Sequence, residues 1–141
     1  MSFNERHRAR GFAIQALYEI DATSHDPADI IRRQTDITTL SPENSRFVTE
    51  LVTGVLANKA SIDDYIRRFA HVWPMEQMAV VDRNILRLAI FEVLVDNKVP
   101  MRAAINEAVE LAKDFGAQGS PRFVNGVLSA ISALATEGKG G

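Results

Sequence analysis

The densest apolar stretch of the chain, residues 80–95, restricts the folds that the chain can adopt. At the helical repeat of about 3.6 residues, its apolar side chains point to two neighbouring faces of one helix. A helix that is apolar on most of its surface must be covered on most sides, so this segment is predicted to be a central strut for other helices. Its charged residues are expected at its start, at its rim or in buried pairs: Asp82, Arg83, Arg87 and Glu92.

Prolines mark where further helices are expected to begin. Each stands immediately before an apolar-periodic segment, at the first helical position that proline tolerates: Pro27, Pro42, Pro74, Pro100 and Pro121. Alternating strand patterns and two-residue hairpin turns are missing. The chain is therefore predicted to be all-α, with about six or seven helices.

The whole-chain properties are those of an ordinary globular protein. The chain has 141 residues, 46% of them hydrophobic and 24% charged, which suits one domain with a substantial core. We expect that domain to span residues 1–137 and residues 138–141 to form a flexible tail. The chain has no cysteine, no apolar run of roughly 20 residues and a polar, arginine-rich start, so disulfides, a membrane span and a signal peptide are not expected. A cytoplasmic protein is the default expectation.

Several local patterns predict how the helices pack. The first helix, expected over Asn4–Ala22, should bury Ala9, Phe12, Ala13, Ala16, Leu17 and Ile20 and expose His7, Arg8, Gly11, Gln15 and Tyr18. Gly54 lies inside a predicted helix, where close contact with another helix would justify it. Ser61–Asp64 resembles a capping box at or near a helix start. Arg87, on the central helix, needs an acidic partner, for which Glu107 is preferred.

Known catalytic and metal-binding patterns are missing from the sequence. The three histidines, His7, His25 and His71, lack metal-ligand spacing and are expected to be solvated at the surface. The glycine-rich segment 116–120 lacks the ending of a phosphate-binding loop and follows a helix instead of a strand. Glu107 and Glu110 are one helical turn apart, but solvated or salt-bridged glutamates are the commoner outcome. No catalytic residue, metal or cofactor is predicted.

A basic and aromatic cluster near the N-terminus is the most informative functional pattern. Arg6, Arg8 and Arg10 lie close together, and Arg8 shares the exposed stripe of the first helix with Gln15 and Tyr18. Guanidinium groups pair with phosphates and stack on bases, and an exposed tyrosine can also stack. The net charge is −2, so nucleic-acid binding would depend on a local patch of this kind. A solvated helix start is the alternative interpretation.

A second candidate surface joins the end of one helix to the start of the next. It contains Lys113, Phe115, Arg122 and Phe123, and it includes a helix N-terminus that could attract an anion. On spacing alone, the two phenylalanines are better explained as core residues.

Four sequence blocks together resemble one known family. They are Arg8-Ala9-Arg10 followed by residues 13–18 (AIQALY), residues 86–92 (LRLAIFE), residues 105–113 (INEAVELAK) and residues 123–128 (FVNGVL). In order and content these blocks are similar to the transcription antitermination factor NusB family, and they span nearly the whole chain. The sequence departs from the best-known pattern at His7, which interrupts the arginine run, at Gly11 and at Pro121.

The resemblance implies an all-α fold of about seven helices in two small packed bundles, with no enzymatic activity. It implies binding to the boxA element of ribosomal RNA leader transcripts together with ribosomal protein NusE, and indirect links to other Nus factors and RNA polymerase. By resemblance, the RNA-binding residues are Arg6, Arg8, Arg10, Gln15, Tyr18, Lys113, Phe115, Arg122 and Phe123. The partner-binding residue is Asp82, expected at the exposed start of the central helix.

Other functions and assemblies stay open at the level of sequence. One alternative is a stand-alone RNA- or protein-binding module of the kind fused to ribosomal RNA methyltransferases. Another is a purely protein-binding helical module without RNA affinity. Some NusB-like proteins are homodimers that bury their RNA surface, so monomer and homodimer are both compatible with the sequence.

Overall fold

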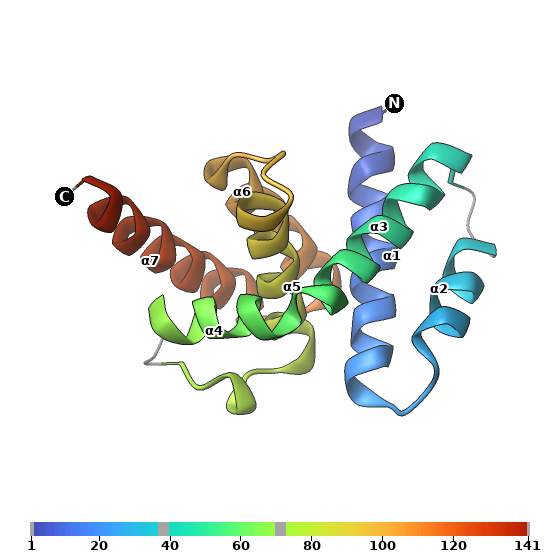
Figure 1. Cartoon of the computed structure of the whole chain (residues 1–141), viewed down its shortest axis with the longest axis horizontal. Helices are drawn as coiled ribbons and strands as arrows, with labels where there is room; N and C mark the ends of the chain where they lie inside the picture. The colour runs from blue at the N-terminus through green and yellow to red at the C-terminus, as the bar shows by residue number, and fades with distance from the viewer. Residues whose placement is uncertain (1, 37–39, 70–72, 141) are drawn as a thin grey trace.

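The computed structural model describes residues 2–36, 40–69 and 73–140, and within them the chain is built from helices (Figure 1). The α-helices are α1 (Ser2–Ala22), α2 (Pro27–Asp36), α3 (Pro42–Ala57), α4 (Lys59–Phe69), α5 (Val80–Ile90), α6 (Met101–Phe115) and α7 (Ser120–Gly140). Two short segments complete the order: the 3₁₀ turn η1 (Met75–Gln77) and the π-helical turn η2 (Phe91–Val95). The all-α prediction is confirmed. None of the helices in the described ranges combines the length and apolarity that crossing a bilayer requires.

The helices form two bundles that meet along α1 and α5. Helices α1, α2 and α3 pack against one another, and α4 to α7 form the second group, as Figure 1 shows. Helix α1 also packs on α5 and α6, which joins the bundles. Helix α7 continues to Gly140; residue 141 lies outside the described residues, and the flexible tail stays a prediction.

Helical periodicity explains which side chains form the core. On α1, Ala9, Ala13, Ala16 and Leu17 are buried as predicted, and Ile14 is buried as well. On α5, the seven consecutive residues 84–90 are all buried, so the prediction of a central strut is confirmed.

The central helix is not regular over its whole predicted length. After Ile90 the chain widens into η2, in which Asp96 N donates to Phe91 O at 2.9 Å, five residues back. The wider turn accompanies a close approach of two helices. The ring of Phe91 lies so near Gly54 on α3 that a Cβ atom at Gly54 would overlap it. The predicted close contact at Gly54 is thereby confirmed.

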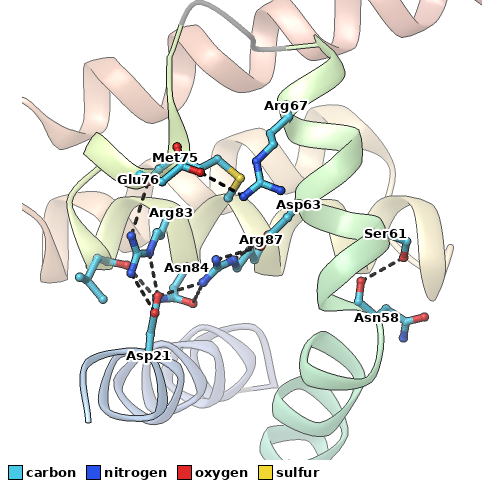
Figure 2. Close-up of polar contacts among 11 residues, drawn as sticks. Asp21, Asn58, Ser61, Asp63, Arg67, Met75, Glu76, Arg83, Asn84 and Arg87 are labelled. Carbon is cyan, nitrogen blue, oxygen red and sulfur yellow. Dashed lines mark hydrogen bonds and ion pairs between the residues drawn. The ribbon is translucent and has the colours of Figure 1, made fainter.

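Two predictions about the central region are wrong (Figure 2). Arg87 does not pair with Glu107: it donates to Asp63 at 2.8 and 3.0 Å and to Asp21 at 2.9 Å. Ser61–Asp64 is not a capping box, because α4 already begins at Lys59 and the Ser61 hydroxyl donates to the Asn58 carbonyl at 3.0 Å. Asp63 faces inward as the partner of a buried arginine, where an unpaired charge would be costly.

Asp21 at the end of α1 connects the two bundles through the same network. Its carboxylate accepts two hydrogen bonds from Arg83 at 2.8 Å each and one from Asn84 at 3.0 Å, in addition to that from Arg87. Figure 2 shows Asp21 pointing from α1 toward these three α5 side chains. The network fixes where α1 lies on α5, and it therefore positions the exposed face of α1.

Candidate nucleic-acid interface

The exposed stripe of α1 borders two adjoining hollows. The larger, of about 550 Å³, is lined by Ile14, Gln15, Tyr18, Glu19, Thr23, Gln34, Val81 and Phe115. The smaller, of about 170 Å³, is lined by His7, Arg8, Gly11, Phe12, Gln15, Asp114 and Phe115. Gln15 and Phe115 line both hollows, which together are called the α1 groove below. The structure thus brings together Arg8, Gln15 and Tyr18, predicted from one helix face, with Phe115 from a helix about 100 residues later.

The groove combines aromatic and polar side chains. Tyr18 is 45% exposed, and Arg8 and Gln15 are also exposed. Phe115 is half-buried, so it packs on the core and still lines the groove. The aromatic rings can stack on bases, the guanidinium group can pair with phosphate, and the amide can hydrogen-bond to base edges.

Gly11 has a different role from the one predicted. The sequence predicted it on the exposed face of the first helix, but it is buried. A Cβ atom at this position would lie 2.9 Å from Cζ of Phe115. The missing side chain therefore makes room for the Phe115 ring, which covers α1 at this point.

The three N-terminal arginines do not form one patch. Arg6 donates to Asn44 Oδ1 at 3.1 Å and lies over the Phe47 ring, 3.9 Å from its centroid, both on α3. Arg10 donates twice to Glu92 at 2.9 Å each, and its side chain is only 15% exposed. At 100° per residue, Arg8 points roughly 160° away from both of them around α1. Of the three arginine side chains, only that of Arg8 lines the α1 groove.

His7 is not the solvated residue that the sequence predicted. Its ring lies between two α6 carboxylates, with Nδ1 at 2.6 Å from Glu107 Oε1 and Nε2 at 2.7 Å from Asp114 Oδ2. Partial burial lowers the pKa of His7, but the two carboxylate hydrogen bonds outweigh that effect and raise the pKa above its ordinary value. His25 is exposed and bonds to Glu19 at 2.8 Å, and His71 lies outside the described residues.

The second candidate surface is only partly joined to the α1 groove. Lys113 is exposed and pairs with Glu110 at 3.1 Å, and Arg122 is exposed in the first turn of α7. Phe123 is half-buried and meets Trp73 edge-on, with ring centroids 6.3 Å apart. Phe123 therefore behaves as the core residue that spacing favoured, while Lys113 and Arg122 are exposed but line neither hollow of the α1 groove.

Asp82 lies in the first turn of α5 but is not exposed. The residue is 8% exposed, and its buried Oδ1 has no hydrogen-bond partner among the described residues. The prediction that Asp82 is exposed at the start of the central helix is wrong, because the packing of α5 buries this side chain within the first turn. A carboxylate in the first turn of a helix is still favoured by the helix dipole.

Within the described ranges, no group of three or more potential metal ligands among His, Cys, Asp and Glu comes together. Residues that the sequence reasoning missed are Asp21 and Asp63, which hold α5 in place, and the acidic pair around His7. The i, i+7 spacing of Glu107 and Asp114 places both on one helix face, which was the available signal for that pair.

Fold and groove together define an all-α protein of two helical bundles with an aromatic, arginine-lined groove along its first helix. A family model described as the NusB family matches residues 7–133. The chain belongs to the NusB family.

Relatives and solved structures agree with this assignment. The chain is 48% identical over 135 residues to the transcription antitermination protein NusB of Dehalococcoides mccartyi, covering 95% of this chain and 94% of that protein. It is 48% identical over 128 residues to the protein of the same name from Roseiflexus castenholzii, covering 89% of this chain and 90% of that protein. It resembles the structure of T. maritima NusB with a TM-score of 0.81 and 32% identity, covering 91% of this chain and 90% of that one. A crystal structure of antitermination factors NusB and NusE in complex with dsRNA contains a chain with a TM-score of 0.81 and 26% identity, covering 93% and 98%.

Proposed function

We propose that this protein is an RNA-binding transcription antitermination factor that binds boxA RNA of ribosomal RNA leader transcripts together with ribosomal protein NusE. Family membership and the likeness to a chain in the NusB–NusE–dsRNA crystal structure support this function. The single observation that carries it in this chain is the α1 groove, where Arg8, Gln15, Tyr18 and Phe115 come together.

The groove residues suggest a division of roles toward RNA. Arg8 pairs with phosphate, Gln15 hydrogen-bonds, and Tyr18 and Phe115 stack on unpaired bases. Lys113 and Arg122, which are exposed outside the groove lining, add positive charge that attracts the RNA backbone at longer range. We propose each of these contacts from the chemistry of the side chain and its position in the structure.

The remaining predicted contacts need a rearrangement or a partner. Arg10, with a side chain 15% exposed and bonded to Glu92, would have to leave that carboxylate to reach RNA. Arg6 and Phe123 are partly exposed but already contact Asn44 and Trp73. Asp82, with a buried oxygen that still lacks a hydrogen bond, is proposed to contact NusE when the complex forms. Through NusE the protein would act with other Nus factors and RNA polymerase, in the cytoplasm and without catalysis of its own.

A titration of labelled boxA RNA, with and without NusE, tests this function. Arg8→Ala should weaken binding and reduce the slope of log affinity against log salt by about one, the effect of one lost phosphate contact. Arg32→Ala is the matched control, because Arg32 is an exposed arginine on α2 that pairs with Asp29 outside the groove. Equal affinity and slope in the two variants would reject the groove as the RNA site.

The same titration separates the alternatives. Binding of RNA without any contribution from NusE would favour the stand-alone module related to the methyltransferase-fused domains. A lack of RNA affinity even with NusE present would favour the purely protein-binding module.

A further inference from the structure

His7 occupies a position in the α1 groove that only a charged imidazole can satisfy. Both ring nitrogens lie within hydrogen-bond distance of carboxylate oxygens, 2.6 Å from Glu107 and 2.7 Å from Asp114. A neutral imidazole has one N–H donor, and its other nitrogen is an acceptor that would face an acceptor oxygen. The imidazolium has two donors, so the geometry is that of protonated His7.

Loss of the proton would change the charge of the groove itself. His7 and Asp114 line the smaller hollow together with Arg8 and Phe115. With His7 protonated, two carboxylates and one imidazolium carry one net negative charge; with His7 neutral, they carry two. The side chain of Asp114 is 50% exposed, so its released carboxylate would stand free at the place where RNA phosphates approach.

The other charged groups around His7 cannot replace its proton. From α6, Glu107 and Asp114 face the ring, and Lys113 is engaged by Glu110. From α1, Arg8 lines the same hollow as His7 and Asp114, but the only ion pair that Asp114 makes among the described residues is with His7. Arg10 comes within 3.9 Å of Glu107, although its two hydrogen bonds go to Glu92 of η2 at closer range. Glu107 therefore keeps a weak second cation when His7 is neutral, whereas Asp114 loses its ion pair.

We infer that His7 is a positioning residue for RNA, which in its protonated form neutralises Asp114 and holds it against α6, so that RNA affinity falls when His7 loses its proton. This inference rests on the proposed RNA-binding function. The raised pKa of His7 is consistent with it, since the proton is retained above the pH at which an ordinary histidine loses it.

The sign of the pH effect follows from linkage. RNA phosphates beside the groove favour the charged ring, so bound RNA raises the pKa of His7 further. Affinity is then highest below the pKa of the free protein and falls as pH rises through the pKa of the complex. A difference of about one pKa unit between the two states corresponds to about a tenfold loss of affinity.

Affinity for boxA RNA should be measured with NusE present from about pH 5.5 to about pH 8.5, a range around the ordinary histidine pKa of about 6.5. We expect the unchanged protein to lose about tenfold in affinity across it. His7→Arg keeps the cation at every pH and should bind with little pH dependence, whereas His7→Gln should bind weakly throughout. Asp114→Asn removes the carboxylate and should retain tight binding at the upper end of the range.

Two further measurements keep the outcomes separate. Arg32→Gln is the control, because Arg32 is an exposed residue on α2 that pairs with Asp29 outside the groove, so the pH profile should stay unchanged. An NMR titration of the His7 ring in the free protein tests its raised pKa without RNA. If His7→Arg or Asp114→Asn reproduced the pH profile of the unchanged protein, the inference would be overturned. If the unchanged protein bound no RNA at any pH, the proposed function itself would fall, and the inference with it.

Discussion

Replacement of Asp21 by asparagine isolates the contribution of the network that joins the two bundles. The Asp21 carboxylate accepts four hydrogen bonds, from Arg83, Asn84 and Arg87, at distances of 2.8 to 3.0 Å. Asparagine keeps one acceptor oxygen and places an N–H donor where the other oxygen stood. Arg83 would lose its counter-ion, while Arg87 would keep Asp63.

The size of the effect follows from burial and from the remaining partner. Breaking a buried ion pair by removing one member costs about 3–5 kcal/mol in free energy of unfolding. The lower end applies here, because the side chain of Arg83 is 20% exposed and water can solvate part of it. We expect a loss of about 3 kcal/mol, which is a decrease in Tm of roughly 6–12 °C for a domain of this size.

The effect should depend on pH in a defined direction. Burial raises the pKa of Asp21, but the hydrogen bonds from Arg83 and Asn84 and the charge of Arg87 outweigh it and hold the pKa well below its usual range. A carboxyl group with a depressed folded-state pKa stabilises the protein fully above its unfolded pKa of about 3.9, and this stability is lost as pH falls toward the folded value. The difference between the two proteins should therefore be full at neutral pH and decrease in acid.

Urea unfolding of both proteins, at neutral pH and in acid, measures these quantities. Asp29→Asn is the control, since Asp29 pairs with Arg32 at 2.8 Å with both side chains more than 60% exposed, and such pairs contribute about 0–1 kcal/mol. A loss for Asp21→Asn no larger than that for Asp29→Asn would refute the reasoning. A difference that stayed constant into acid would refute the linkage argument.

Three further predictions follow from single contacts and can be checked by urea unfolding. Arg10→Ala should lower the free energy of unfolding by about 3 kcal/mol, because it leaves the buried Glu92 carboxylate without its bidentate partner; a loss below about 1 kcal/mol would contradict this role. Gly54→Ala should destabilise the protein by about 1–3 kcal/mol through overlap with Phe91, a cost that exceeds the gain in helix propensity. Gly126→Ala is its matched opposite, since a Cβ there meets no described atom within 4 Å, and the variant should gain up to about 1 kcal/mol. Equal effects at the two glycines would show that packing at Gly54 is looser than the contact indicates.

Helices and their buried faces could be predicted because periodicity is local. The apolar positions of α1 and α5 repeat at the helical period, and packing against neighbours buries those positions whatever the neighbours are. The partner of a buried charge is not local information. Arg87 selects Asp63 and Asp21 over Glu107 because α4 and the end of α1 lie against its face of α5, and no spacing in the sequence encodes that arrangement.

The candidate site was predictable to the extent that it lies on one helix. Arg8, Gln15 and Tyr18 share a stripe of α1, and the structure leaves that stripe exposed. Phe115 joins it through the crossing of α6, for which Gly11 supplies the space. The position of His7 between two carboxylates depends on the same crossing, so its change from surface residue to paired residue could not be read from the sequence.

The alternation of arginines at the start of α1 serves two functions at once. Because residues two apart in the sequence differ by roughly 200° around a helix, Arg6 and Arg10 lie on nearly the same side of α1 and Arg8 lies on the opposite side. The inner pair attaches α1 to α3 and η2, through Asn44 and Glu92. That attachment directs Arg8 toward the α1 groove. The three arginines look like a single basic patch in the sequence, but two of them hold α1 against its neighbours and one lines the groove. Arg10→Ala and Arg8→Ala should therefore separate stability from RNA affinity, although the two residues are almost adjacent in the chain.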